Sequence, residues 1–221
     1  MNISGGLTGG DRLSIEVAVG EGASATVTTP ACEHIYRSAG GDASIEQRLR
    51  VDRAARLDWI PQETIVFDRG RVRRRLEVEL AHDAEITIAE TLIFGRAAMG
   101  ESVKQGSLSD FWTVRRDGHL LYADAIRIDD PVASTLGSSA TLNGHKAFAS
   151  LLHVGRDLAA KRDELRAAFS LAPGSPAGAS IIGDILVARV AAPIGASLRH
   201  SIIPALACLR APLPLPRFWS C

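Results

Sequence analysis

The sequence has 221 residues, of which 46% are hydrophobic and 23% charged, a balance typical of one sizeable globular domain. Its 25 basic and 25 acidic residues give a formal net charge of zero, which excludes any bulk electrostatic argument for binding to nucleic acid or membranes. We find no apolar run long enough to span a membrane and no signal-peptide pattern.

The chain opens on a glycine-rich stretch, "SGGLTGGD", at residues 4–11. A nucleotide-binding P-loop requires a lysine that this stretch lacks, and a dinucleotide-binding loop requires a preceding strand and a following helix. Residues 12–19 instead alternate between polar and apolar, as a strand does. The stretch therefore predicts a glycine turn that leads into a strand.

Residues 5–130 carry a repeated strand–turn–strand pattern. Its copies begin at Val19, Val51, Leu80 and Val114 and are 32, 29 and 34 residues apart. A period near 30 residues is typical of stacked β-units that bury a shared core. We therefore predict a β-helix-like stack within a mainly β, α+β fold that also contains two helices.

Acidic residues occur at apolar positions of this pattern. Glu90 follows Ile86 and Ile88 on the same face, Asp124 takes the equivalent place in the fourth copy, and Glu63 lies two residues further along in the second. If the strands are unbroken, these carboxylates point inward from successive layers. Such an interior would suit cation handling or acid–base chemistry. A bulge that reverses the alternation, or pairing with arginines, would be a purely structural explanation.

The segment "RGRVRRR" at residues 69–75 places Arg69, Arg71, Arg73 and Arg75 on one strand face and Arg74 on the other. A solvated strand face explains this pattern best. The alternative is a basic binding module for phosphate or for an acidic partner.

The part from about residue 145 to 210 alternates strands with helices. We expect a strand at 147–154, a helix at 157–169, a linker at 172–180, a strand at 181–190, a helix at 194–210 and an extended tail at 211–221. This part would pack beside the β-stack within a single domain, 1–221.

The three cysteines, Cys32, Cys208 and Cys221, are too few and too scattered for a disulfide framework, which favours a cytoplasmic protein. Cys32 and His34 form the one tight pair of soft metal ligands, and two ligands do not make a zinc site. The usual hydrolase motifs are missing from the sequence.

A series of motifs resembles the UreD (UreH) family of urease accessory proteins. They run in family order from residue 4 to the end: "GGLTGGDRLSI", "IYRS", "LDWIPQETIVF", "RRRLEVEL", "AETLIFGR", "GE" at 100–101, "LLYADAIRID" and "LPRFW". The resemblance implies a protein that is not itself an enzyme. It would join UreF and the GTPase UreG on apo-urease and help to deliver nickel.

The resemblance also implies a β-helical fold and an internal water-filled passage for transient Ni²⁺, with no permanently bound cofactor. Asp11, Glu90 and Asp124 match acidic positions of the family motifs, and with Glu63 they are the candidate passage residues. Several strands that precede the "GGLTGG" motif in the family are expected to be missing here. The alternative enzymatic hypothesis is a β-helix glycosidase with Glu90 and Asp124 as its carboxylate pair.

Overall fold

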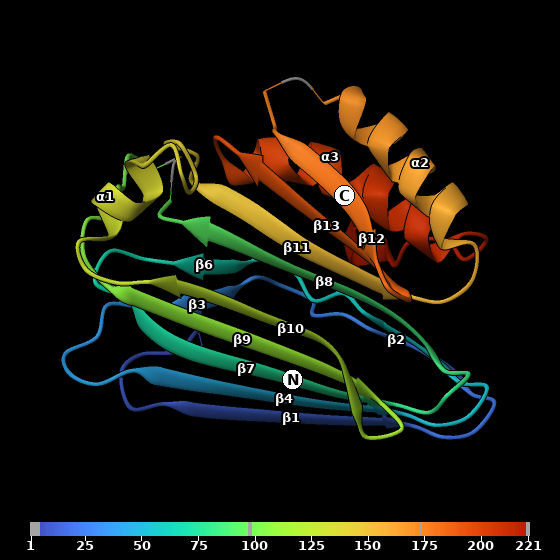
Figure 1. Ribbon diagram of the computed structural model, residues 1–221. Coiled ribbons are helices and arrows are strands. Elements are labelled where there is room, and N and C mark those ends of the chain that lie inside the picture. Colours follow the sequence, from blue (N-terminus) through green and yellow to red (C-terminus); the bar gives the residue numbers. More distant parts are fainter. Residues whose placement is uncertain (1–4, 97–98, 173, 220–221) are drawn as a thin grey trace.

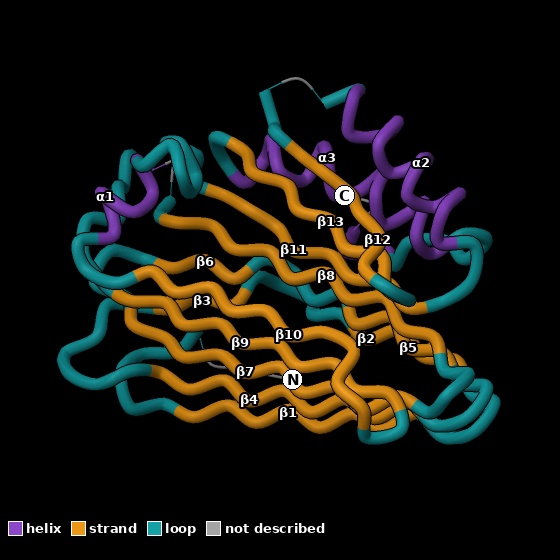
Figure 2. Tube along the Cα trace, viewed as in Figure 1, coloured by secondary structure: helices purple, strands orange, loops and turns teal. Residues whose placement is uncertain are grey.

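The computed structural model describes residues 5–96, 99–172 and 174–219. Two β-sheets lie face to face, and helices cover the outer face of one of them (Figures 1 and 2). The second sheet is thus sandwiched between the first sheet and the helices, whereas the first sheet leaves its outer face uncovered in this view.

The first sheet has the strand order β1-β4-β7-β9-β10. Neighbours from β1 to β9 run parallel, and β10 runs antiparallel to β9. The strands are β1 (Arg12–Val19), β4 (Ala43–Val51), β7 (Arg71–Leu80), β9 (Ser107–Arg116) and β10 (His119–Ile128).

The second sheet has the order β12-β13-β11-β8-β5-β2, and two short strands extend it beside β8. Three of its strands pair in parallel as part of the repeat stack: β2 (Ser24–Val27), β5 (Arg56–Trp59) and β8 (Glu85–Phe94). Its later strands are β11 (Ala147–Val154), β12 (Ala177–Ile182) and β13 (Ile185–Ala192). The short strands are β3 (Glu33–Ile35) and β6 (Thr64–Val66).

The first three repeats stack as the sequence predicts. Val19 pairs with Val51 and Val51 with Leu80 in the first sheet, while Leu57 pairs with Ile86 in the second. The offsets of 32 and 29 residues are therefore the true spacings of the layers. The β-helix-like stack is confirmed for these turns.

The fourth repeat departs from the prediction. Leu80 pairs with Arg116 rather than with Val114, and β10 folds back onto β9 instead of joining β8. The cause is the Asp117–Gly118 turn, in which both residues have positive φ, 49° and 77°. Such a turn matches the twist of an antiparallel hairpin. The place beside β8 is taken by β11, so Glu90 and Asp124 do not lie in equivalent layers.

The helices of the C-terminal part are α2 (Leu158–Ser170) and α3 (Gly195–Arg210), close to the predicted bounds. A short α1 (Val132–Gly137) and a 3₁₀ turn, η2 (Arg217–Trp219), were not predicted. The expected linker and the strand after it are instead the β12–β13 hairpin, because Gly183 (φ 54°) and Asp184 form a tight turn.

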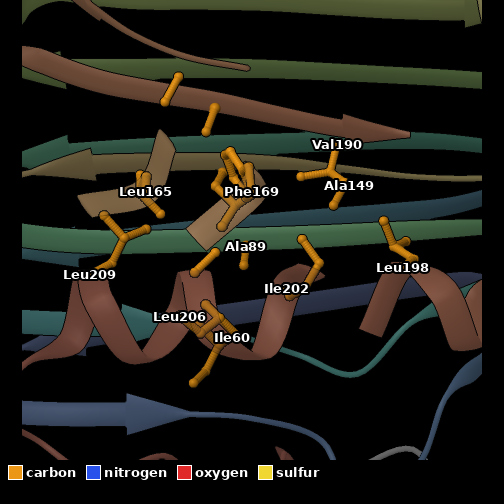
Figure 3. Close-up of a cluster of buried hydrophobic side chains, with 14 of the residues drawn as sticks. Ile60, Ala89, Ala149, Leu165, Phe169, Val190, Leu198, Ile202, Leu206 and Leu209 are labelled. Carbon is orange, nitrogen blue, oxygen red and sulfur yellow. The ribbon is translucent and has the colours of Figure 1, made fainter. Parts of the chain in front are cut away.

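The helices α2 and α3 pack on the second sheet through a continuous apolar cluster, shown in Figure 3. Leu198, Ile202, Leu206 and Leu209 of α3 face this cluster at helical spacing. The last residue of α3, Arg210, is anchored by a 2.5 Å contact between its Nη1 and Oδ2 of Asp58 on β5. These contacts fix the helices against the sheet.

His153 lies on the same helix-facing side of β11 and is only 2% exposed. Its Nδ1 is 3.0 Å from Oγ1 of Thr87. Burial, together with the nearby Lys161 and Arg56 charges, lowers the pKa of His153 to about 3. The ring is therefore neutral in the folded protein.

We predict that His153 makes the protein acid-sensitive. Because its pKa is lower in the folded state than the unfolded value near 6.5, the unfolded chain binds the extra proton, and stability falls as pH drops below about 6.5. His153 should lower the free energy of unfolding by about 1.6 kcal/mol between pH 6.5 and pH 5. Urea denaturation across this range gives the free energy of unfolding of wild type and of His153→Gln at each pH. The slope of this free energy against pH should be smaller for His153→Gln.

The control is His119→Gln, at an exposed position on β10. This variant should keep the wild-type slope of the free energy of unfolding against pH. Equal slopes for wild type and His153→Gln would contradict the assignment.

Candidate functional site

A layer of polar residues crosses the space between the two sheets. It separates two apolar clusters, one at each end of the sandwich. In each contributing strand, the residues two positions before and after the polar one belong to opposite clusters, as Val72 and Leu76 do around Arg74. We call this set the polar layer: Gln47, Arg74, Asp110 and Asp124 from the first sheet, and Glu90, Ser150 and Arg189 from the second.

Glu90 lies at the centre of the polar layer and is 4% exposed. It accepts hydrogen bonds from Arg74 Nη2 on the facing sheet, from Trp59 Nε1 at 2.7 Å and from Gln47 Nε2 at 3.4 Å. A buried carboxylate requires such partners, since an isolated one would cost many kcal/mol. Glu90 is therefore held as a charge-compensated group that joins β8 to β7 and β4.

Arg74 is 2% exposed and contacts a second carboxylate, with its Nε 3.7 Å from Oδ1 of Asp110 on β9. Burial raises the pKa of Asp110, an effect that the Arg74 charge opposes in part. For Arg74 itself, burial lowers the pKa, but the Asp110 and Glu90 carboxylates outweigh it and keep the pKa raised. One guanidinium thus compensates two carboxylates.

The polar layer reaches solvent at the seam between β10 and β13. There Asp124 is paired with Arg189, whose side chain is 56% exposed against 16% for Asp124. Arg189 lines two surface hollows, and one of them is also lined by Ser150. The seam therefore gives access from the surface to a residue of the layer.

Four buried atoms of the polar layer lack a hydrogen-bond partner among the described residues: Gln47 Oε1, Arg74 Nε, Asp110 Oδ1 and Ser150 Oγ. Nearly all buried polar atoms in native proteins have a hydrogen-bond partner, so several buried atoms without one in a single layer indicate room for a further binding partner. Three of these atoms can accept a hydrogen bond from water or coordinate a cation, whereas Arg74 Nε can only donate.

Glu63 is buried but does not face the polar layer. Trp59 pairs with Ile88 and Thr64 with Leu92, so the segment that leads from β5 to β6 has one residue more than the facing part of β8. This extra residue reverses the alternation, as a bulge does. Glu63 points toward α3, where Nη1 of Arg199 lies 2.8 Å from its Oε1. The prediction that Glu63 shares a face with Glu90 is wrong.

Asp11 lies outside the polar layer, exposed in the turn before β1, where its Oδ2 accepts the Thr8 N–H at 2.8 Å. The predicted glycine turn is present: Gly10 has a φ of 92°, and a Cβ on Gly9 would lie 2.4 Å from the Gly40 carbonyl oxygen. Of the four predicted passage residues, the structure brings only Glu90 and Asp124 into the layer.

Sequence reasoning did not identify Asp110, nor Arg74 as its partner. The signal was available, because Asp110 alternates with Leu108, Trp112 and Val114 just as Glu90 does with its apolar neighbours. Within the described ranges, no group of three or more His, Cys, Asp and Glu side chains converges as a metal site.

Three other arginines of the segment 69–75 lie on the exposed outer face of the first sheet. Arg71 and Arg73 both pair with Asp42, and Arg75 pairs with Glu77. Arg69 lies in a turn with a φ of 62°, so placing it on the strand face was wrong. This face fits the predicted solvated strand surface.

A model of the family "UreD urease accessory protein" matches residues 1–220. The chain is 43% identical over 220 residues to a urease accessory protein UreD of Rhizobium etli, covering all of this chain and 80% of the relative. The chain belongs to the UreD family of urease accessory proteins. Membership of this family supports a role in urease maturation.

Other UreD proteins are similar to this chain over nearly all of its length. A urease accessory protein UreD of Methylobacterium sp. (strain 4-46) is 44% identical over 223 residues, which cover 99% of this chain and 79% of that protein. One from Chelativorans sp. (strain BNC1) is 45% identical over 220 residues, covering 100% of this chain and 78% of the relative. The helices in the described ranges are all too short or too polar to span a bilayer.

We predict that the buried ion pairs of the polar layer carry a large stability cost when broken. Arg74→Ala leaves Glu90 and Asp110 buried without a counter-charge, so the free energy of unfolding should fall by about 3–5 kcal/mol. Arg73→Ala, one residue away but 70% exposed, should change it by less than about 0.5 kcal/mol. Urea denaturation at pH 7 compares the two variants. Similar losses in both would show that Arg74 is not buried among carboxylates.

Proposed function

We propose that this protein is a non-catalytic urease maturation chaperone that joins UreF and UreG on apo-urease and passes Ni²⁺ through its polar layer. The nickel ion is cargo in this proposal, bound transiently and released. Free Cys32 and Cys208 are in keeping with action in the reducing cytoplasm.

The observation that carries the proposal is the polar layer itself. It places three carboxylates, a serine hydroxyl and an amide between two apolar clusters and opens at the seam beside Arg189. Oxygen ligands bind Ni²⁺ less strongly than imidazole or thiolate, which suits release more than storage. The layer thus combines an access route with weak ligands.

The surroundings of Glu90 disfavour the alternative glycosidase. A glycosidase acid must approach the scissile bond of a sugar, with a second carboxylate placed across it. Glu90 is enclosed, and its oxygens are engaged by Arg74, Trp59 and Gln47. Asp124 is bound to Arg189. This arrangement is one of charge compensation between strands.

We predict that the double variant Glu90→Gln/Asp124→Asn lowers urease activation while it leaves binding to UreF, UreG and urease intact. Amides preserve the volume of the layer but remove two anionic ligands for the cation. Urease activity in cells that co-express the accessory proteins should fall at least about tenfold, a change of 1.4 kcal/mol in the limiting step. Co-purification of the partners measures complex formation in the same cells.

A matched control is Glu46→Gln/Glu77→Gln, which removes two carboxylates from the exposed outer face of the first sheet. It should leave activation unchanged. Full activation by Glu90→Gln/Asp124→Asn, with the protein present at normal level, would rule out transport through the layer.

A further inference from the structure

The polar layer already contains two cations of its own. Its three carboxylates, Glu90, Asp110 and Asp124, face two guanidinium groups, Arg74 and Arg189. Arg189 lies at the seam and is largely exposed, whereas Arg74 is enclosed at the centre. The two arginines therefore occupy different points along the route from the surface.

Arg74 bridges the two sheets. It projects from β7, donates to Glu90 on β8 in the facing sheet, and places its Nε 3.7 Å from Asp110 on the neighbouring β9. Its Nη1 also donates to Oγ1 of Thr64 on β6 at 3.3 Å. The guanidinium thus lies between two carboxylates, where a divalent cation would have to sit to use both of them.

We propose that Arg74 holds the layer closed by occupying the cation position between Glu90 and Asp110, and that its displacement opens this position to a divalent cation. The inference rests on the proposed transit function and adds the element that controls it. Arg74 is a positioning residue in this scheme, since it acts on the cation through the two carboxylates.

Charge supports this role. With the guanidinium moved away, Glu90 and Asp110 present two negative charges, which match the charge of one divalent ion. Without such an ion, both carboxylates would stay buried with no positive charge beside them. The same layer holds two further acceptors without a hydrogen bond, Gln47 Oε1 and the Oγ of Ser150, the residue paired with Glu90 across β8 and β11. Arg74 Nε has no hydrogen bond of its own, so part of the guanidinium is held only by ionic attraction.

The test measures Ni²⁺ binding to the purified protein by isothermal titration calorimetry. Wild type and Arg74→Lys, which both keep a positive charge, should bind weakly. Arg74→Gln should gain about one site that binds at least tenfold more tightly than in wild type, which equals 1.4 kcal/mol. Arg74→Gln/Glu90→Gln should lose that site, and comparison with it subtracts binding by surface histidines and cysteines.

Loss of stability in Arg74→Gln does not prevent the test. A cation that binds only the folded state raises its melting temperature. Ni²⁺ should therefore raise the melting temperature of Arg74→Gln more than that of wild type, Arg74→Lys or Arg74→Gln/Glu90→Gln. Equal shifts and equal affinities in Arg74→Gln and wild type would overturn the proposal, as would an unchanged site in Arg74→Gln/Glu90→Gln.

The experiments distinguish failure of the closure by Arg74 from failure of Ni²⁺ transit through the polar layer. If Glu90→Gln/Asp124→Asn impairs urease activation but Arg74→Gln gains no site, the closure by Arg74 is wrong and the transit function stands. If Arg74→Gln gains the site but Glu90→Gln/Asp124→Asn activates urease normally, transit through the layer is wrong, and closure, which rests on it, falls as well.

Discussion

The contact between Arg74 and Glu90 joins the two sheets at the centre of the molecule. Burying both charges is costly, and the cost is offset only while Trp59, Gln47, Thr64 and Asp110 stay in place around them. Six strands, β4 to β9, must therefore keep their register for this contact to exist. The polar layer around this contact also lies between the two apolar clusters that fill the space between the sheets.

Much of the fold could be predicted because its signals are local. The stacking of the first three repeats follows from period-two alternation, and the strand β11 and the helices α2 and α3 emerge at nearly the predicted bounds. The failures have identifiable physical causes. The Asp117–Gly118 turn redirects β10, and the Gly183–Asp184 turn makes a hairpin of the expected linker and the strand after it. One extra residue before Thr64 turns Glu63 away.

The candidate site could be predicted in part. Alternation placed Glu90 and Asp124 on the interior face, and it could have placed Asp110 there too. Their partners could not be predicted, because Arg74 and Arg189 meet the acids only through the facing of two sheets and through pairing between distant strands. A charge on an apolar face can be recognised from a sequence, whereas the group that compensates it is a property of the assembled fold.

The hairpin of β9 and β10 has a consequence for how the family can vary in length. A stack of parallel strands can in principle grow by duplication of one unit, because each new layer pairs with the previous one just as its neighbours do. The reversal at Asp117–Gly118 makes β10 antiparallel, so no further unit of the same kind can continue the series beyond β9. The hairpin acts as a stop on that side, and duplication of the unit could lengthen the stack only among the layers that precede it.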